Sequence, residues 1–137
     1  MLRAFHVQGH STFFTAVSII DRYFIGAYHQ KLVVGPEYLH LVGMAAVLIA
    51  SKFEDVEPIT LNRLLKFAGR SMFSKLSIIA MEKSMLQTIG FRVLCPPGSY
   101  AEPLLAFKLA FPQANQGAED YATFLCYLSV YSPLDLA

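Results

Sequence analysis

Residues 35–53 read GPEYLHLVGMAAVLIASKF, and this run predicts a helix. Pro36 suits the first helical position because its missing N–H would have no partner there, and Glu37 places an acid in the first turn. Apolar residues then fall on every side of the helix: Leu39, Leu41, Val42, Met44, Val47, Leu48 and Ile49. A helix that is apolar all round must be buried. We therefore expect residues 35–53 to form the central rod of a helical bundle.

Glycine, proline and capping residues divide the rest of the chain into segments of helical length. Ser11 and Ser74 are candidate N-caps, and Gly26 and Gly90 are candidate left-handed residues that end helices. Almost nothing alternates with the period of two typical of a half-buried strand. The chain is therefore predicted to be all-α. The further helices are expected at about 11–26, 60–68 (ending before Gly69), 74–89, 100–111 and 119–131.

The composition excludes several classes of protein. The 137 residues are 55% hydrophobic and only 15% charged, and such an apolar chain is not disordered. A net charge of +1, with no cluster of cations, argues against binding to nucleic acid. The uncharged runs are too short or too polar for a membrane span or a signal peptide. The low charge instead indicates deeply buried helices or an apolar surface for a protein partner.

The residues that carry metal, redox or nucleophilic chemistry are scattered. Cys95 and Cys126 lack CxxC spacing, which favours a reducing compartment over a zinc site or a disulfide framework. The four histidines show no HxxxH spacing, and no nucleophile elbow or Gly-rich phosphate loop is present. We expect no catalytic residue, no cofactor and no metal. The aromatic residues of the C-terminal segments fall at helical spacing and are expected in a core: Tyr100, Phe107, Phe111, Tyr121, Phe124, Tyr127 and Tyr131.

Lys52 stands at the end of the apolar rod, on the same side as Ala45 and Leu48. One interpretation is that its charge interacts with the carbonyl end of the helix dipole. From the residues alone we favour this interpretation, because lysine is almost never fully buried without a paired charge.

Glu82 interrupts an apolar stripe on the predicted helix 74–89, between Ile79 and Leu86. It could be an exposed glutamate that pairs with Lys83 or Lys75 on the helix surface. Alternatively, Ile79, Glu82 and Leu86 form a second contact face, whose charge is directed at a donor on another protein.

Several runs of the sequence, in this order and spacing, resemble the cyclin box of A- and B-type cyclins. They are 18–24 (SIIDRYF), 39–43 (LHLVG), 48–55 (LIASKFED), 81–83 (MEK) and 86–91 (LQTIGF). The resemblance implies a helical bundle around a central buried helix. It implies a cyclin box over residues 1–94 with a shortened first helix, followed over 95–137 by the beginning of a second, truncated cyclin fold.

The resemblance also implies a function. Cyclins of this type bind a cyclin-dependent Ser/Thr kinase and pack on its αC helix, which must be placed so that its Glu pairs with the ATP-binding Lys. The chain would then be a regulatory subunit in cell-cycle control, acting in the nucleus and cytoplasm, and not an enzyme itself. The residues that match the family's kinase-binding positions are Lys52, Glu82, Ile49, Phe53, Leu86 and Phe91.

Other matching positions are structural in the family or belong to its substrate-docking patch. Asp21, beside Arg22, matches an aspartate that pairs with an arginine on the first helix of the box. Here Arg3 either folds back onto Asp21 or, as we favour, leaves this carboxylate to solvent or to another partner. Leu39 and His40 match one wall of the docking patch, and since the opposite wall would come from the shortened helix, we favour a core-rim position for Leu39.

Alternative functions stay open. Cyclin-fold transcription or scaffold proteins grip DNA, but they need a basic face that this chain lacks. A truncated product with weak or no kinase activation is also consistent with the shortened first helix. Whatever the function, a shortened first helix and a truncated second fold would leave four apolar side chains without their usual cover, and the isolated chain should then self-associate. They are Phe13, Phe14, Phe107 and Phe124.

Overall fold

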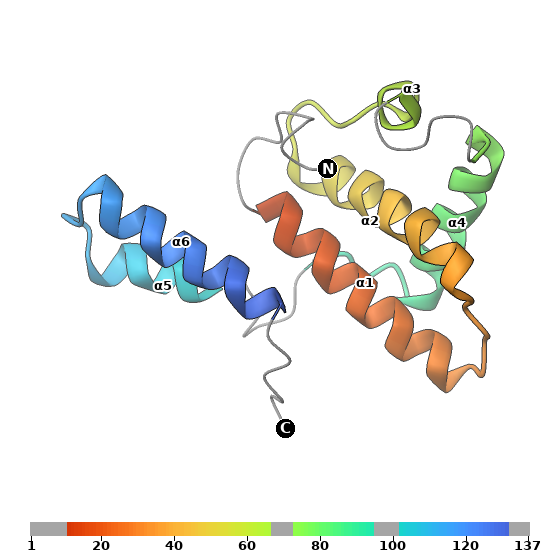
Figure 1. Cartoon of the computed structure of the whole chain (residues 1–137), viewed down its shortest axis with the longest axis horizontal. Coiled ribbons are helices and arrows are strands. Elements are labelled where there is room, and N and C mark those ends of the chain that lie inside the picture. Colours follow the sequence, from red (N-terminus) through yellow and green to blue (C-terminus); the bar gives the residue numbers. More distant parts are fainter. Residues whose placement is uncertain (1–10, 67–72, 95–101, 132–137) are drawn as a thin grey trace. The chain divides into compact units, whose positions relative to one another are not determined.

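A computed structural model describes residues 11–66, 73–94 and 102–131, and all regular structure in these ranges is helical (Figure 1). The prediction of an all-α chain is confirmed. By its internal contacts the chain divides into two units, Met1–Cys95 and Pro96–Ala137. The helices are α1 (Ser11–His29), η2 (Pro36–Tyr38), α2 (Leu39–Glu54), α3 (Leu61–Leu64), α4 (Lys75–Thr88), α5 (Glu102–Ala110) and α6 (Gln116–Tyr131).

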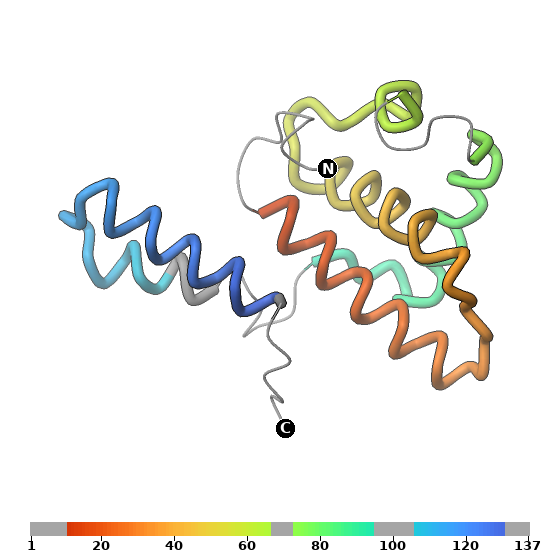
Figure 2. The backbone as a smooth tube through the Cα atoms, in the orientation of Figure 1, coloured from red at the N-terminus to blue at the C-terminus, as the bar shows by residue number. Residues whose placement is uncertain are grey.

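Helix α2 is the buried centre of the first unit, as its apolar sequence predicted. Every residue from Met44 to Ser51 is buried, and α2 packs against α1, α3, α4 and the short helix η2. The helix begins later than expected, because Pro36–Tyr38 form a separate 3-10 turn. Such a turn is frequent at the N-terminus of an α-helix. Figure 2 shows the backbone reversing between α1 and α2, so that the start of α1 lies near the end of α2.

Helix α1 continues past Gly26, where the sequence suggested a stop. It ends at His29, and Lys31 takes the left-handed conformation with φ 55°. The N–H of Leu32 donates to the carbonyl of Ala27 at 2.9 Å, which completes a Schellman motif. The expected end at Gly26 was wrong because this glycine serves packing: a Cβ there would lie 2.6 Å from Thr88 Cγ2 of α4.

Helix α4 has the limits that its capping residues predicted. The hydroxyl of Ser74 accepts a hydrogen bond from the N–H of Ser77 at 3.1 Å. At the other end, Gly90 has φ +65°, and the N–H of Phe91 reaches the carbonyl of Leu86 at 2.8 Å in a second Schellman motif. Phe91 itself has φ 59°, which is uncommon for a large side chain.

Some expectations fall on residues outside the described ranges. The shortened first helix and Arg3 lie in residues 1–10, and Gly69, the expected stop of the helix begun at Thr60, lies in 67–72. Thr60 itself caps α3, since its hydroxyl accepts from the N–H of Arg63 at 3.3 Å. Cys95 and Tyr100 also lie outside the description.

The second unit is a pair of helices, α5 and α6, that pack on each other. Helix α6 begins at Gln116 and not at residue 119, because Asn115 Oδ1 accepts from the N–H of Ala118 at 2.8 Å and so caps the first turn. Within the part of the chain that the structure describes, no helix is both long and apolar enough to cross a membrane.

The aromatic residues of the second unit do not form the expected core. Phe111, Tyr121 and Phe124 are 59%, 63% and 54% exposed, and no residue of this unit whose side chain is described is buried. Two helices can cover only the faces that they turn to each other, so Tyr121 and Phe124 of α6 and Phe111, just after α5, stay in solvent. The prediction for Phe14 was wrong in the opposite direction. This side chain was expected to be left exposed, and it is fully buried in the first unit.

Candidate functional site

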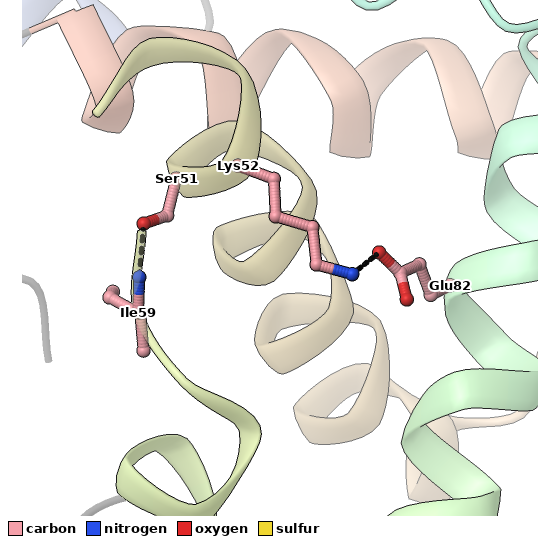
Figure 3. A network of polar contacts seen from close by, with 4 residues as sticks. All are labelled: Ser51, Lys52, Ile59 and Glu82. Carbon is pink, nitrogen blue, oxygen red and sulfur yellow. Dashed lines mark hydrogen bonds and ion pairs between the residues drawn. The ribbon is translucent and has the colours of Figure 1, made fainter. Parts of the chain in front are cut away.

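An ion pair joins the two helices whose charges stood out in the sequence. Lys52, in the last turn of α2, reaches across to Glu82 in the middle of α4, and Nζ lies 2.6 Å from Oε1 (Figure 3). The lysine side chain is 52% exposed, whereas the glutamate side chain is only 14% exposed. Glu82 therefore pairs with Lys52 and not with Lys75 or Lys83, the surface partners considered from the sequence.

The pair retains hydrogen-bonding capacity. A lysine ammonium carries three donors and an ionised carboxylate accepts at two oxygens. The contact between Nζ and Oε1 uses one donor of Lys52 and one oxygen of Glu82. A polar group that approached the open side of Lys52 could therefore bond to the pair without breaking it.

Apolar side chains with exposed surface lie near this pair in the sequence, on α2 and α4 and just beyond α4. Phe53 follows Lys52 and is 51% exposed, and Ile79, one turn before Glu82 on α4, is 47% exposed. Leu86, one turn after Glu82, is half-buried against the core, and Phe91, just beyond α4, is 67% exposed. We name these residues the α2–α4 face: Lys52, Phe53, Ile79, Glu82, Leu86 and Phe91.

Ile49, which the resemblance also placed among the kinase contacts, lies apart from this face. Its side chain is 3% exposed and belongs to the hydrophobic core. It stands one turn before Lys52 in α2, a helix that packs against α1 and α4. In the free chain Ile49 is therefore a core residue, and its contact with a kinase stays a prediction.

Arg22 connects α1 to the segment that follows α4. Its Nε donates to the carbonyl of Ser18 at 3.3 Å, within α1. The two terminal nitrogens reach 70 residues along the chain: Nη1 donates to the carbonyl of Arg92, and Nη2 to the carbonyl of Val93 at 3.2 Å. Asp21, its neighbour, is exposed, and any contact with Arg3 would involve residues outside the description.

A second set of polar contacts, which the sequence did not reveal, holds the end of α2. Asp55 accepts from Thr12 of α1 at 2.6 Å through Oδ1 and from Ser51 at 2.7 Å through Oδ2. The Ser51 hydroxyl also accepts from the N–H of Ile59 at 2.8 Å (Figure 3). Thr12 and Ser51 are completely buried. The only hint in the sequence was a serine on a helix that is otherwise apolar.

Comparison with known proteins identifies the family. Residues 2–94 match the family model described as the cyclin N-terminal domain. The chain belongs to the cyclin family. The resemblance read from the motifs is therefore confirmed, and the helical bundle of the first unit is a cyclin box.

The cyclin box resembles those of B-type cyclins. The chain is 34% identical to G2/mitotic-specific cyclin-B3 of Mus musculus over 87 residues, which is 64% of this chain and 6% of that protein. It is 31% identical to cyclin-B2-1 of Arabidopsis thaliana over 119 residues, 87% of this chain and 26% of that one. G2/mitotic-specific cyclin-1 of Medicago sativa subsp. varia is 30% identical over 135 residues, 93% of this chain and 29% of its own length. The chain thus spans less than a third of these relatives.

The two residues that were predicted to match the family's docking patch, Leu39 and His40, lie at the start of α2. Leu39 is 54% exposed, so it does not have the core-rim position that we favoured. His40 is also exposed, and its ring stacks on Phe73 with centroids 5.7 Å apart and an interplanar angle of 22°. Both side chains are accessible, but the expected opposite wall falls on residues outside the description.

The described part of this cyclin holds no group of three or more side chains that could bind a metal ion. Cys126 of α6 is a free thiol, and burial raises its pKa above the ordinary value. A raised pKa leaves less thiolate at neutral pH, which is the opposite of what a nucleophilic cysteine requires.

Proposed function

We propose that this chain binds a cyclin-dependent Ser/Thr protein kinase through the α2–α4 face and activates it in cell-cycle control by holding the kinase αC helix in its active position. The chain itself supplies no catalytic residue. Its contribution is differential affinity: it binds the active arrangement of the kinase better than the inactive one, and so shifts the population towards the active form.

The observation that supports the proposal is the exposure of the α2–α4 face. Phe53 and Phe91 keep more than half of their surface in solvent, although the unit has a buried core. Exposed aromatic residues grouped with charged ones are typical of the residues that dominate protein interfaces. The same face contains the Lys52–Glu82 pair, which has unused donors and acceptors.

The partly buried glutamate gives this face a preferred polar contact. Glu82 is mostly shielded from water, so its charge interacts with Lys52 at a lower effective dielectric than two exposed groups would. A partner that covers the lysine desolvates the pair further. It must therefore supply hydrogen bonds to both charges, as backbone groups at the end of a helix or in a loop can do.

The test is an exchange of the two charges. Lys52→Glu combined with Glu82→Lys keeps an ion pair between α2 and α4 but reverses what each helix offers to a partner. If a kinase binds both charges, affinity for it should fall by about 2 to 5 kcal/mol, as in other buried charge contacts, while the melting temperature stays close to that of the original chain. Titration calorimetry against a panel of cyclin-dependent kinases measures the affinity.

Lys108→Ala is the matched control, since Lys108 is an exposed lysine of α5, in the other unit. It should leave kinase affinity unchanged. The proposal fails if the charge-exchanged chain binds as tightly as the original. It also fails if no kinase of the panel binds the original chain, which would favour the scaffold function or a product without kinase activation.

A further inference from the structure

Helix α1 contacts both helices that carry the α2–α4 face. It packs against α2 and α4, and it makes long-range polar contacts at its start and again just past its middle. At the start of α1 they reach the residues just after Lys52 and Phe53. At Arg22, just past the middle of α1, they reach the residues just after Phe91.

The contacts at the start of α1 fix the end of α2. Thr12 donates to Asp55, which directly follows α2, and Asp55 also accepts from Ser51, the neighbour of Lys52. The Ser51 hydroxyl is both donor and acceptor, because the N–H of Ile59 bonds to it. The bond between Ile59 and Ser51 is buried, and a buried group that loses its partner is costly because water cannot replace that partner.

One turn further along α1 a parallel contact strengthens the same end. The hydroxyl of Thr15, which is 2% exposed, donates to Glu54 Oε1 at 2.6 Å. Glu54 is the last residue of α2. Two successive residues at the end of α2, Glu54 and Asp55, are thus held by two hydroxyls that lie on one side of α1.

Contacts in the second half of α1 fix the backbone beyond α4. Arg22 donates to the carbonyls of Arg92 and Val93, the two residues after Phe91. Gly26, one turn further along α1, admits Thr88 of α4 at a distance too short for any Cβ. The left-handed Phe91 therefore lies between two places where α1 holds the chain.

We infer that α1 is a brace with two attachment points, the Asp55 end and the Arg22 end, in which Asp55 and Arg22 are positioning residues that hold Lys52, Phe53 and Phe91 in their binding arrangement before a kinase arrives. This inference rests on the proposed function. Its physical basis is that a surface already ordered in the free chain loses less conformational entropy on association. A left-handed phenylalanine in particular persists only where the surrounding structure holds it.

Two backbone amides report separately on the two ends. The N–H of Ile59 bonds to the Ser51 hydroxyl at the Asp55 end, and the N–H of Phe91 bonds to the carbonyl of Leu86 at the Arg22 end. Local opening of either end should appear as faster hydrogen exchange at its own amide. Measured on the full chain without a partner, this readout does not depend on kinase binding.

The variants are Arg22→Gln, which removes the guanidinium, and Asp55→Asn, which keeps the shape of the side chain but loses one carboxylate acceptor. We expect Arg22→Gln to speed exchange at Phe91 about tenfold with little change at Ile59, and Asp55→Asn to do the reverse. Each should weaken kinase binding about five- to tenfold. Arg22→Lys, which can still reach one carbonyl, should fall between Arg22→Gln and the original chain in both measurements.

Arg63→Gln is the control, because Arg63 is an exposed arginine of α3 that takes part in neither end of the brace. It should change neither amide nor the affinity. Equal acceleration of both amides by Arg22→Gln would show general destabilisation and overturn the brace. A local acceleration with unchanged kinase affinity would overturn the positioning role. If the original chain binds no kinase, the proposed function fails, and the exchange pattern alone then decides whether the two ends exist.

Discussion

Gly26 of α1 and Thr88 of α4 approach so closely that a Cβ at residue 26 would lie 2.6 Å from Thr88 Cγ2 and 3.3 Å from the Thr88 carbonyl oxygen. The threonine cannot easily turn away, because its hydroxyl donates to the carbonyl of Ser84 at 2.8 Å. The two helices are in contact at this point because residue 26 has no side chain.

The first prediction is that Gly26→Ala destabilises the chain. Crowding in a packed interface costs about 1 to 3 kcal/mol, and the better helix propensity of alanine returns up to about 1 kcal/mol. We expect a net loss of about 1 to 2 kcal/mol in the free energy of unfolding, measured by urea denaturation. Gly43→Ala in α2 is the matched control, since a Cβ at Gly43 meets nothing within 4 Å. It should stabilise the chain by about 0.5 to 1 kcal/mol, and an equal effect of both variants would contradict the close approach.

The second prediction concerns the hydroxyl at the end of α2. Ser51→Ala removes the acceptor of the Ile59 N–H and one donor to Asp55, and both Ser51 and Ile59 are buried. Leaving a buried group without its partner costs about 1 to 3 kcal/mol, which thermal denaturation should show as a lower melting temperature. Ser77→Ala removes only an exposed hydroxyl contact to Ser74 and should have little effect. If both variants lowered the melting temperature equally, the cost of losing the Ser51 hydroxyl would not depend on its burial.

The third prediction concerns Cys126, whose thiol has a pKa raised by burial. Because only the thiolate reacts, alkylation by iodoacetamide at pH 8 should be slower in the folded chain than in urea. The ratio of the two rates should approach one as the pH rises above the folded pKa. Cys95→Ser isolates Cys126 for this measurement. A rate ratio that stays constant with pH would mean that restricted access, and not the pKa, slows the reaction.

The fourth prediction is self-association of the isolated chain. Phe111, Tyr121 and Phe124 leave an apolar surface on the second unit, and chains with such surfaces tend to associate. Sedimentation at rising concentration should show dimers or larger species. Phe124→Ser should weaken the association about tenfold or more, as expected for a side chain whose burial contributes about 1.5 to 3 kcal/mol. Tyr28→Ser changes an 80% exposed residue of α1 and should not weaken the association. A chain that stays monomeric at all concentrations would refute the prediction.

The local parts of the fold could be predicted because they depend on neighbouring residues. The central helix follows from an apolar run on all sides, the start of α4 from Ser74, and its end from Gly90. The expected end at Gly26 failed for the opposite reason. What requires a glycine there is Thr88, a residue far along the chain, and no local pattern reveals such a contact.

The same difference between local features and long-range contacts applies to the candidate site. Lys52 and Glu82 stood out one by one, because each charge interrupts an apolar pattern, but their pairing joins residues 30 apart and depends on how α2 packs on α4. Thr12 and Asp55, 43 apart, are ordinary polar residues in the sequence. The motif names the position of Ile49 without saying whether its side chain faces outward, and in the structure this side chain is buried.

Phe91 shows a conflict between what the chain needs for folding and what this position contains. The backbone there is left-handed, a conformation that glycine adopts without steric cost and that a large side chain resists. With two-thirds of its surface in solvent, the phenyl ring recovers little of that cost through burial. Glycine at this position would therefore suit folding at least as well as phenylalanine. The aromatic ring lowers the stability of the isolated chain, and contact with a partner would offset that cost by burying the ring.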